Sequence, residues 1–412
     1  MTAAIAENWL RVFRRYLPSA LTFLAGTGSF LVADVIIGRF AATNDVKDWV
    51  LLKSIMLPLA TVALLGIDQV VVREPSKLQL YIRPTIALSL FISAMSSFLL
   101  WISGFYAHPT ILFFAVFGVA SSYFFFGVFR STLNFNMAQF ARDGWKALFL
   151  VILIPIYFAF NMPIHVAFLV AITIVLVVVT WKYATSVRSD MNEVHNEVNG
   201  FKSALGVSWP FCLGALSLSI ASYGELLLLN GFGGDAFLPE YFRSTLLYSM
   251  PIITFNTLFV TYLGSAIRER PEKYSKLMLK YKNVSYWIIA IFPVASLLFG
   301  LLISPIVFKD HSTPIEIAIL LSLTAGIRVH YSIISSFVGV LAVKTEMQKI
   351  SLLYFAIAIS TPIFCFIVYQ STQQLMLAVA ITGVYHWVAR NSIGWRLLQR
   401  VCNRNARQCP AD

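Results

Sequence analysis

Residues 285–307 read SYWIIAIFPVASLLFGLLISPIV, twenty-three consecutive residues without a charged side chain. A helix of about 20 apolar residues spans the roughly 30 Å hydrocarbon core of a bilayer, so this stretch predicts a transmembrane helix. Stretches of the same kind recur along the whole chain. They are too long and too uniformly apolar for the strands of a membrane barrel. The sequence therefore predicts an all-α polytopic membrane protein.

The composition supports the same class. Of the 412 residues, 58% are hydrophobic and 12% are charged, against about 25% charged in soluble domains. These proportions exclude a soluble enzyme, a disordered chain and a disulfide scaffold. The net charge of +12 does not indicate nucleic-acid binding, because membrane proteins concentrate Lys and Arg in cytoplasmic loops and against anionic phospholipids.

Twelve spans can be drawn, and they form two groups of six. The expected spans are 17–38, 49–71, 84–105, 110–129, 146–162, 164–185, 207–230, 242–264, 285–307, 315–341, 350–369 and 376–396. The pair at 146–162 and 164–185 fits two short crossings better than one re-entrant hairpin around Asn161, Met162 and Pro163. The first span lacks a clear small-residue cleavage site, so we do not expect a cleaved signal peptide.

The positions of Lys and Arg predict the orientation. With the N-terminus inside, 25 of the 31 basic residues fall in inner segments. The outer segments hold Arg39, Lys47, Arg243 and Lys309. The positive-inside rule then places both termini in the cytoplasm, which requires an even number of spans.

An internal repeat relates the two groups of spans. At an offset of about 192 residues, Pro18 aligns with Pro210, and Asp34 falls one position from Glu225. The chain therefore divides into an N-terminal six-helix bundle, residues 1–200, and a C-terminal bundle with a basic cytoplasmic tail, residues 201–412. A parallel repeat of two such bundles around a central cleft is an architecture of transporters that work by alternating access.

Ionisable groups inside the spans are the candidate site, because each costs at least about 2.5–3.5 kcal/mol near the bilayer centre. Cations expected to line a substrate cavity are Arg39, Lys53, Arg243 and Arg328, and the cavity or ion-coupling acids are Asp34 and Glu225. Structural alternatives remain open. Lys53 and Arg243 could extend to the interface, and Asp34 could pair with Arg39. Glu225 could sit in a satisfied helix contact, and Arg328 could form a buried ion pair with Glu316 or with an acid of another helix.

Three further charged residues follow the second span at its inner end. Asp68, Arg73 and Glu74 are interpreted as an inner gate or as a clamp of the loop. His330 lies within the tenth span, and a single histidine there is more often a hydrogen-bonded core residue than a proton carrier.

Catalytic and metal motifs are not found. The run Gly26-Thr27-Gly28 lies inside a span and lacks the third glycine of a dinucleotide fingerprint, and the sequence has no Walker loop, H-E-x-x-H or G-x-S-x-G. The four cysteines form no ligand cluster and are expected to be free thiols. We therefore expect no enzyme activity, no cofactor and no metal.

The stretch from Leu64 to Glu74, LLGIDQVVVRE, resembles the end of the second helix in Wzx-type polysaccharide (O-antigen) flippases. These belong to the multidrug/oligosaccharidyl-lipid/polysaccharide exporter superfamily, and their pattern there is G-[LIF]-D-x-x-[LIV]-[LIV]-R-[EF]. The seventh span is also similar, with Glu225 before a leucine run and a Gly-rich turn. Family members tend to have Asp in place of Glu225, which leaves the exact role of this acid open.

The resemblance implies a flippase of the bacterial inner membrane. It would move an oligosaccharide linked to undecaprenyl pyrophosphate towards the outer leaflet, for O-antigen or a similar surface polymer. The coupling ion would be H⁺ or Na⁺, and the polysaccharide polymerase and chain-length machinery would be partners. The competing interpretation on the same fold is a multidrug or other small-molecule ion-coupled antiporter.

Overall fold

The computed structural model describes residues 2–187, 198–309 and 311–407. Within these ranges the chain is helical apart from short turns, and no strand occurs. Eight of the described helices are long and apolar enough to cross a membrane, and a ninth span forms when α2 and α3 are taken as one helix bent by 51°. The protein is therefore an integral membrane protein.

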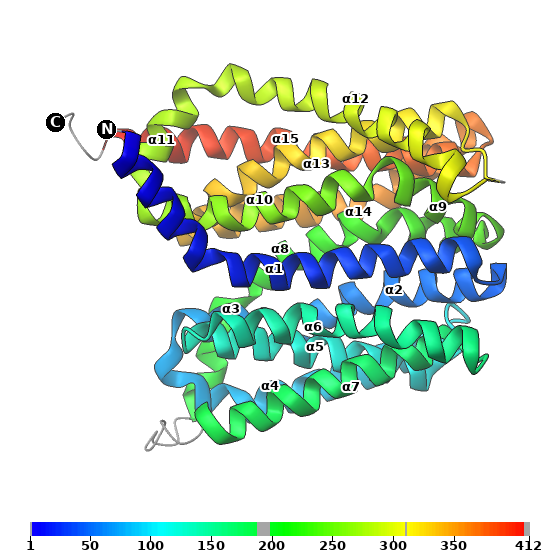
Figure 1. Ribbon diagram of the computed structural model, residues 1–412, viewed down its shortest axis with the longest axis horizontal. Helices are drawn as coiled ribbons and strands as arrows, with labels where there is room; N and C mark the ends of the chain where they lie inside the picture. Colours follow the sequence, from blue (N-terminus) through cyan, green and yellow to red (C-terminus); the bar gives the residue numbers. More distant parts are fainter. Residues whose placement is uncertain (1, 188–197, 310, 408–412) are drawn as a thin grey trace. The chain divides into compact units, whose positions relative to one another are not determined.

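The first half of the chain contributes six membrane-length helical segments (Figure 1). They are α1 (Thr2–Phe40), α2 (Thr43–Leu64) with α3 (Ile67–Arg73), α4 (Leu78–Ile102), α5 (Pro109–Ser131), α6 (Phe135–Leu153) with η2 (Ile154–Ala159), and α7 (Ile164–Lys182) with η3 (Tyr183–Val187). The short helix η1 (Pro75–Lys77) connects α3 to α4.

The second half repeats this order. Its segments are α8 (Val198–Gly231), α9 (Leu238–Tyr248) with α10 (Met250–Glu269), α12 (Lys282–Val307), α13 (Ile315–Leu341), α14 (Lys344–Thr372) and α15 (Leu375–Arg407). Two short helices join them: η4 (Asp235–Phe237) precedes α9, and α11 (Pro271–Lys280) follows α10. All twelve expected spans are represented among the described helices.

Several described helices extend well beyond the expected spans, as α1 does at its start and α15 at its end, and α6 is one of them. Helix α6 begins at Phe135, eleven residues before the span predicted at 146–162. The polar residues that hid this start neutralise one another, because the buried carboxylate of Asp143 accepts from Gln139 and pairs with Arg142 and Lys146. Helices α6 and α7 pack side by side, and α7 is long and apolar enough to cross a membrane, so two crossings remain the prediction for this region.

Packing divides the chain into two compact units. One comprises residues 1–33 and 59–209, and the other comprises residues 34–58 and 210–412. The end of α1 and most of α2 thus pack with the second half of the sequence. This grouping follows contacts rather than the sequence repeat, so the expected bundles of residues 1–200 and 201–412 remain a prediction.

In the first unit, α5 is the central helix and packs against α3, α4, α6 and α7. Small side chains allow the close approach. A Cβ atom at Gly127 would lie 2.9 Å from the carbonyl oxygen of Asp68, and one at Gly118 would lie 3.0 Å from Ile172. Opposite α5, helix α4 presents the buried small residues Thr85, Ser89, Ser93 and Ser97 at intervals of four.

A break separates α2 from α3. Leu65 and Gly66 both adopt left-handed backbone conformations, with φ of 47° and 75°. Two such residues in succession cannot continue a right-handed helix, and Leu65 pays a steric cost that Gly66 avoids. The break lies inside the motif of residues 64–74 that resembles the flippases. Its left-handed backbone conformation explains why the motif has a glycine at position 66.

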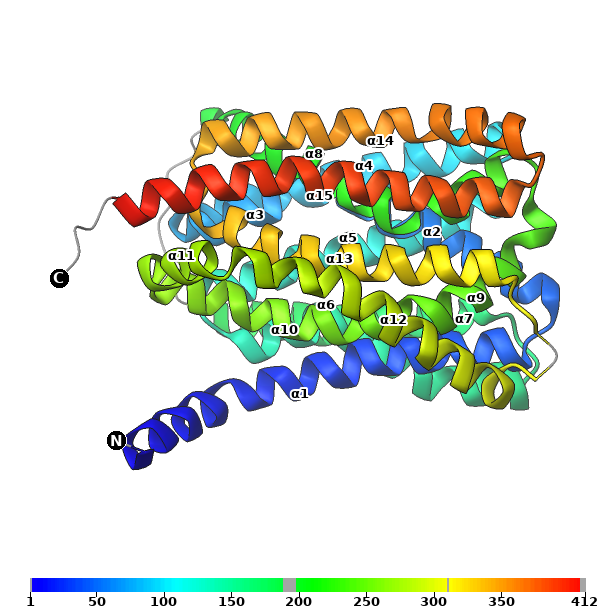
Figure 2. The same cartoon turned by 90° about the horizontal axis from the view of Figure 1, so that it is seen from above.

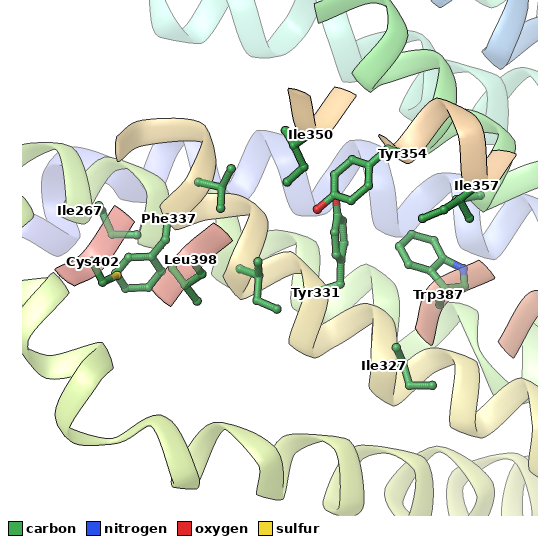
Figure 3. Packing of buried hydrophobic residues seen from close by; sticks show 13 residues of the cluster. Ile267, Ile327, Tyr331, Phe337, Ile350, Tyr354, Ile357, Trp387, Leu398 and Cys402 are labelled. Atoms are coloured by element: carbon green, nitrogen blue, oxygen red, sulfur yellow. The ribbon is translucent and has the colours of Figure 1, made fainter. Parts of the chain in front are cut away.

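In the second unit, α13 is the central helix and packs against α9, α10, α12 and α15. Helix α14 runs beside α15 (Figure 2). A buried cluster fills the space between them, with Tyr331 of α13 meeting Tyr354 of α14 and Trp387 of α15 in edge-to-face contacts (Figure 3). Such rings add packing energy beyond the area they bury.

The two glycines of Gly26-Thr27-Gly28 provide a matched test of the first unit. Adding a Cβ at Gly26 places it 2.6 Å from Cβ and the carbonyl oxygen of Asp143, whereas one at Gly28 meets nothing within 4 Å. We expect Gly26→Ala to lower the thermal unfolding midpoint, because overpacking typically costs about 1–3 kcal/mol. Gly28→Ala should leave the midpoint unchanged or raise it. Equal midpoints for both variants in detergent would contradict the α1–α6 contact.

Candidate functional site: charged side chains of the second unit

A buried ion pair links α1 and α2. The carboxylate of Asp34 accepts from the Nζ of Lys53 and, at 3.0 Å, from the indole Nε1 of Trp49. Trp49 and Lys53 lie one turn apart on α2 and so face the same carboxylate. Asp34 is 3% exposed and Lys53 is 5% exposed. Lys53 therefore does not extend to the interface, and that alternative was wrong.

Arg39 has a different partner from the one suggested by the sequence. Residues 34 and 39 are five positions apart and point to different faces of α1. Arg39 Nη1 donates to the carbonyl oxygen of Ile306 at 3.0 Å, in the last turn of α12. The proposed Asp34–Arg39 pair was therefore wrong.

Arg243 makes the corresponding contact with α1. Its Nε donates to the carbonyl oxygen of Gly38 at 2.7 Å, near the end of α1. A helix ends with unpaired carbonyls and a partial negative charge, so both arginines cap helix C-termini. Beside them, Lys47 of α2 forms an ion pair with Asp235 of η4 and holds the pKa of that carboxyl below its usual value.

Glu225 on α8 lies among groups from two other helices. The phenol of Tyr241 on α9 donates to its Oε2 at 2.7 Å. Gly383 on α15 lies so close to the other carboxylate oxygen that a Cβ there would overlap it. The carboxylate of Glu225 thus fits against α15 because Gly383 has no side chain.

Arg328 lies fourteen positions into α13. Its Nη2 donates to the hydroxyl of Ser222 at 3.3 Å, and its guanidinium carbon lies 4.8 Å from the ring centroid of Trp387. Arg328 is also close enough to Glu225 for a Coulombic interaction. Glu316 lies twelve residues earlier on the same helix, about 18 Å along its axis, so this one of the two alternative partners of Arg328 was wrong. The other alternative, an acid of another helix, agrees with the interaction with Glu225.

The inner residues make local contacts in the first unit. Asp68 accepts from Gln69 Nε2 at 2.7 Å, and Glu74 pairs with Lys77 at 3.3 Å and accepts from Tyr81 at 3.2 Å. Arg73 is exposed at the end of α3. Both the gate and the clamp therefore remain predictions for these three residues.

His330 is confirmed as a core histidine. It is 1% exposed, and its Nδ1 lies 2.9 Å from Asn391 Oδ1.

Sequence reasoning missed two buried charges. Arg390 on α15, counted with the inner loops, is 2% exposed. It donates to the hydroxyl of Ser217, and its guanidinium carbon lies 4.0 Å from the ring centroid of Tyr354. Asp143 was hidden by the late start assigned to its helix. The sequence feature that could have revealed Asp143 is the basic residue three positions later, Lys146. An acid and a base at this spacing lie on the same face of a helix and can neutralise each other.

Metal-site chemistry has no support in the part of the chain that the structure describes. No group of three or more His, Cys, Asp or Glu side chains converges there. What the second unit does offer is guanidinium groups bonded to neutral oxygens, a carboxylate paired with lysine, and a carboxylate bonded to a phenol.

No family model and no curated protein matches the chain. Solved structures of transporters do match. An inward-facing multidrug resistance MATE family transporter of the MOP superfamily aligns at 15% identity and a TM-score of 0.65, covering 93% of this chain and 98% of that one. A mutant of the Vibrio cholerae MATE transporter VcmN aligns at 12% identity and 0.60, covering 98% of each. The chain has the MATE fold.

A third structure, a MATE in the bent conformation, aligns at 14% identity and a TM-score of 0.57 over 96% of each chain. The described residues are helical throughout apart from turns, and transporter structures of this fold cover nearly the whole chain, so the expected all-α polytopic fold class is confirmed. At this level of identity the likeness extends to the fold alone.

Gly383→Ala tests the setting of Glu225. The new methyl group would displace the carboxylate from Tyr241, so we expect transport activity to fall at least about tenfold while the protein still inserts. Gly339→Ala on α13 is the control, because a Cβ there meets nothing within 4 Å. The measurement is the transport activity of both variants at equal expression. Full activity of Gly383→Ala would contradict the close contact between Gly383 and Glu225.

His311 predicts an acid sensitivity. It lies between α12 and α13, and its Nε2 is 3.2 Å from Ser244 Oγ. Burial, and then the charge of Arg243, lower its pKa below 6.5. The folded state resists protonation of this ring, so its contribution to stability is lost as pH falls below about 6.5.

The measurement is the unfolding midpoint in detergent at pH 7.5 and 5.5. The wild type should lose more stability on acidification than His311→Gln, whose amide can keep the bond to Ser244. Parallel losses for the two proteins would contradict this role.

Proposed function

We propose that the protein is a flippase for an oligosaccharide carried on a polyisoprenyl pyrophosphate. It would work by alternating access in the bacterial inner membrane, with both termini cytoplasmic. One observation carries the proposal: Arg39, Arg243 and Arg328 donate to neutral oxygens in the described structure. A guanidinium bonded to a neutral acceptor keeps most of its charge available for an anion.

The chemistry of a lipid-linked pyrophosphate fits these groups. A pyrophosphate that crosses the membrane loses the water molecules that solvate it, so other hydrogen-bond donors must take their place. Guanidinium groups offer paired N–H donors whose spacing matches phosphate oxygens. Lys53 would complete the cationic set, although its partner Asp34 must first be protonated or displaced. The lipid tail can stay in the bilayer while the head group crosses.

The two acids supply the means of ion coupling. A proton or Na⁺ at Asp34 would release Lys53 for the substrate. Protonation of Glu225 would leave the charge of Arg328 less compensated. In both cases uptake of a cation by an acid increases the attraction for an anion. We propose that Asp68, Arg73 and Glu74 clamp or gate the inner ends of the helices.

A multidrug antiporter is the second candidate. The solved neighbours include a transporter described as a multidrug resistance protein. An organic cation could interact with Glu225 and the nearby aromatic rings of Tyr241 and Trp387.

The partners proposed under the first function are the polysaccharide polymerase, the chain-length machinery and anionic phospholipids.

The phenotype of cells that lack the gene distinguishes the two proposed functions. A flippase defect should remove the surface polysaccharide and leave the complete lipid-linked oligosaccharide on the cytoplasmic face. An antiporter defect should leave the polymer intact and change drug or ion sensitivity. A normal surface polymer in the deleted strain would end the flippase proposal.

Arg328→Gln should reduce complementation of that strain by roughly tenfold or more, because the charge is lost while the hydrogen bond to Ser222 can persist. Arg268→Gln, at an exposed position near the end of α10, is the control and should complement fully. Membrane insertion of both variants is measured by blotting. Full activity of Arg328→Gln would show that this cation is not part of the substrate path.

A further inference from the structure

The two arginine caps at the ends of α1 and α12 are reciprocal between the sequence halves. Arg39, from the first half, caps α12 of the second half at Ile306. Arg243, from the second half, caps α1 of the first half at Gly38. All four residues belong to the second compact unit, so the contacts lie within one packed body.

Further contacts hold the same segment. Residues 34–58, here called the α1–α2 hairpin, meet α9 and α12 closely at Gly38, where a Cβ would lie 3.4 Å from Phe308 and 3.5 Å from Leu246. Lys47 of the hairpin pairs with Asp235. The attachment of the hairpin to the second half thus combines tight apolar packing with polar contacts made by Arg39, Lys47 and Arg243.

The acceptors of these cations differ in strength. Lys47 bonds a full negative charge, but Arg39 and Arg243 bond carbonyl oxygens that carry only the partial charge of a helix end. A phosphate adds the Coulombic attraction of a full negative charge and can accept two parallel bonds from one guanidinium, whereas each carbonyl accepts a single bond. A phosphate within reach can therefore take either arginine from its carbonyl.

We propose that the α1–α2 hairpin is a clasp that the anionic head group of the substrate opens. Phosphate oxygens replace Gly38 and Ile306 as acceptors for Arg243 and Arg39, both helix caps are lost together, and the hairpin separates from α9 and α12. This inference rests on the proposed function for the identity of the anion. On the predicted orientation the clasp lies at the outer face, so binding of the cargo favours opening to the outside.

The proposal accounts for two features of the sequence. The outer segments hold few basic residues, yet three of them, Arg39, Lys47 and Arg243, make the contacts of the clasp. The arginines also stand where the acceptor is neutral, and the lysine stands where it is a carboxylate. A purely structural attachment would be stronger with acids opposite all three.

Accessibility of a reporter cysteine measures the clasp. Leu246→Cys lies under the hairpin, at a position 3% exposed in the closed contact. The native Cys212, Cys365 and Cys402 are buried, and burial raises the pKa of the Cys402 thiol to about 11, so they react slowly. Cys409 is replaced by serine in every variant. The readout is the rate of maleimide labelling of the purified full-length protein.

The expected results are specific. Arg39→Gln and Arg243→Gln should each raise labelling of Leu246→Cys roughly tenfold, since each removes a charged hydrogen bond. Inorganic pyrophosphate should raise it in the protein with both arginines, relative to NaCl of equal ionic strength. It should have no further effect when both arginines are glutamine. Ile334→Cys, in the core of the second unit, should stay unlabelled throughout, which excludes general unfolding.

Two outcomes would overturn the proposal. Unchanged labelling in the arginine variants would mean that the caps do not hold the hairpin. Faster labelling in the variants without a response to pyrophosphate would mean that the caps are structural only. A pyrophosphate response in a protein whose deletion leaves surface polysaccharide intact would support an anion-opened clasp while rejecting the lipid-linked oligosaccharide as its cargo.

Discussion

The cost of placing charge in hydrocarbon governs this structure, because each ionised side chain within a span must find a partner inside the protein. The described charges meet this requirement in three ways. Asp34 and Lys53 neutralise each other, and Arg328 and Arg390 lie against aromatic rings and hydroxyls. Arg39 and Arg243 use the unpaired carbonyls of helix ends. In the last two solutions the hydrogen-bond acceptors are neutral oxygens that carry no full negative charge.

The number of spans and the helical class could be predicted because they depend on apolar length alone. Boundaries failed where polar residues satisfy one another within a helix, as Asp143 does with Arg142 and Lys146. The repeat also placed Asp34 and Glu225 on corresponding helices. It could not show that residues 34–58 of α1 and α2 pack with the second half.

Partners were harder to predict than positions. A sequence gives the place of Arg39 or Arg328 along its helix, but the partner depends on which faces meet and at what depth. The alternatives that paired Arg39 with Asp34 and Arg328 with Glu316 used acids of the same helix, and both were wrong. The true acceptors are a carbonyl and a hydroxyl, which composition does not distinguish from the many others in the chain. Arg390 was missed because it lies near the inner end of its expected span and was counted with the loop that follows.

The contact between Glu225 and Gly383 has a consequence for how this protein can vary. The longer acid occupies the volume that a side chain at position 383 would need. A chain with the shorter aspartate at position 225 would have room for alanine or serine at position 383, whereas a chain with glutamate would not. The two positions should therefore change together during evolution, and the identity of one constrains the other although 158 residues separate them.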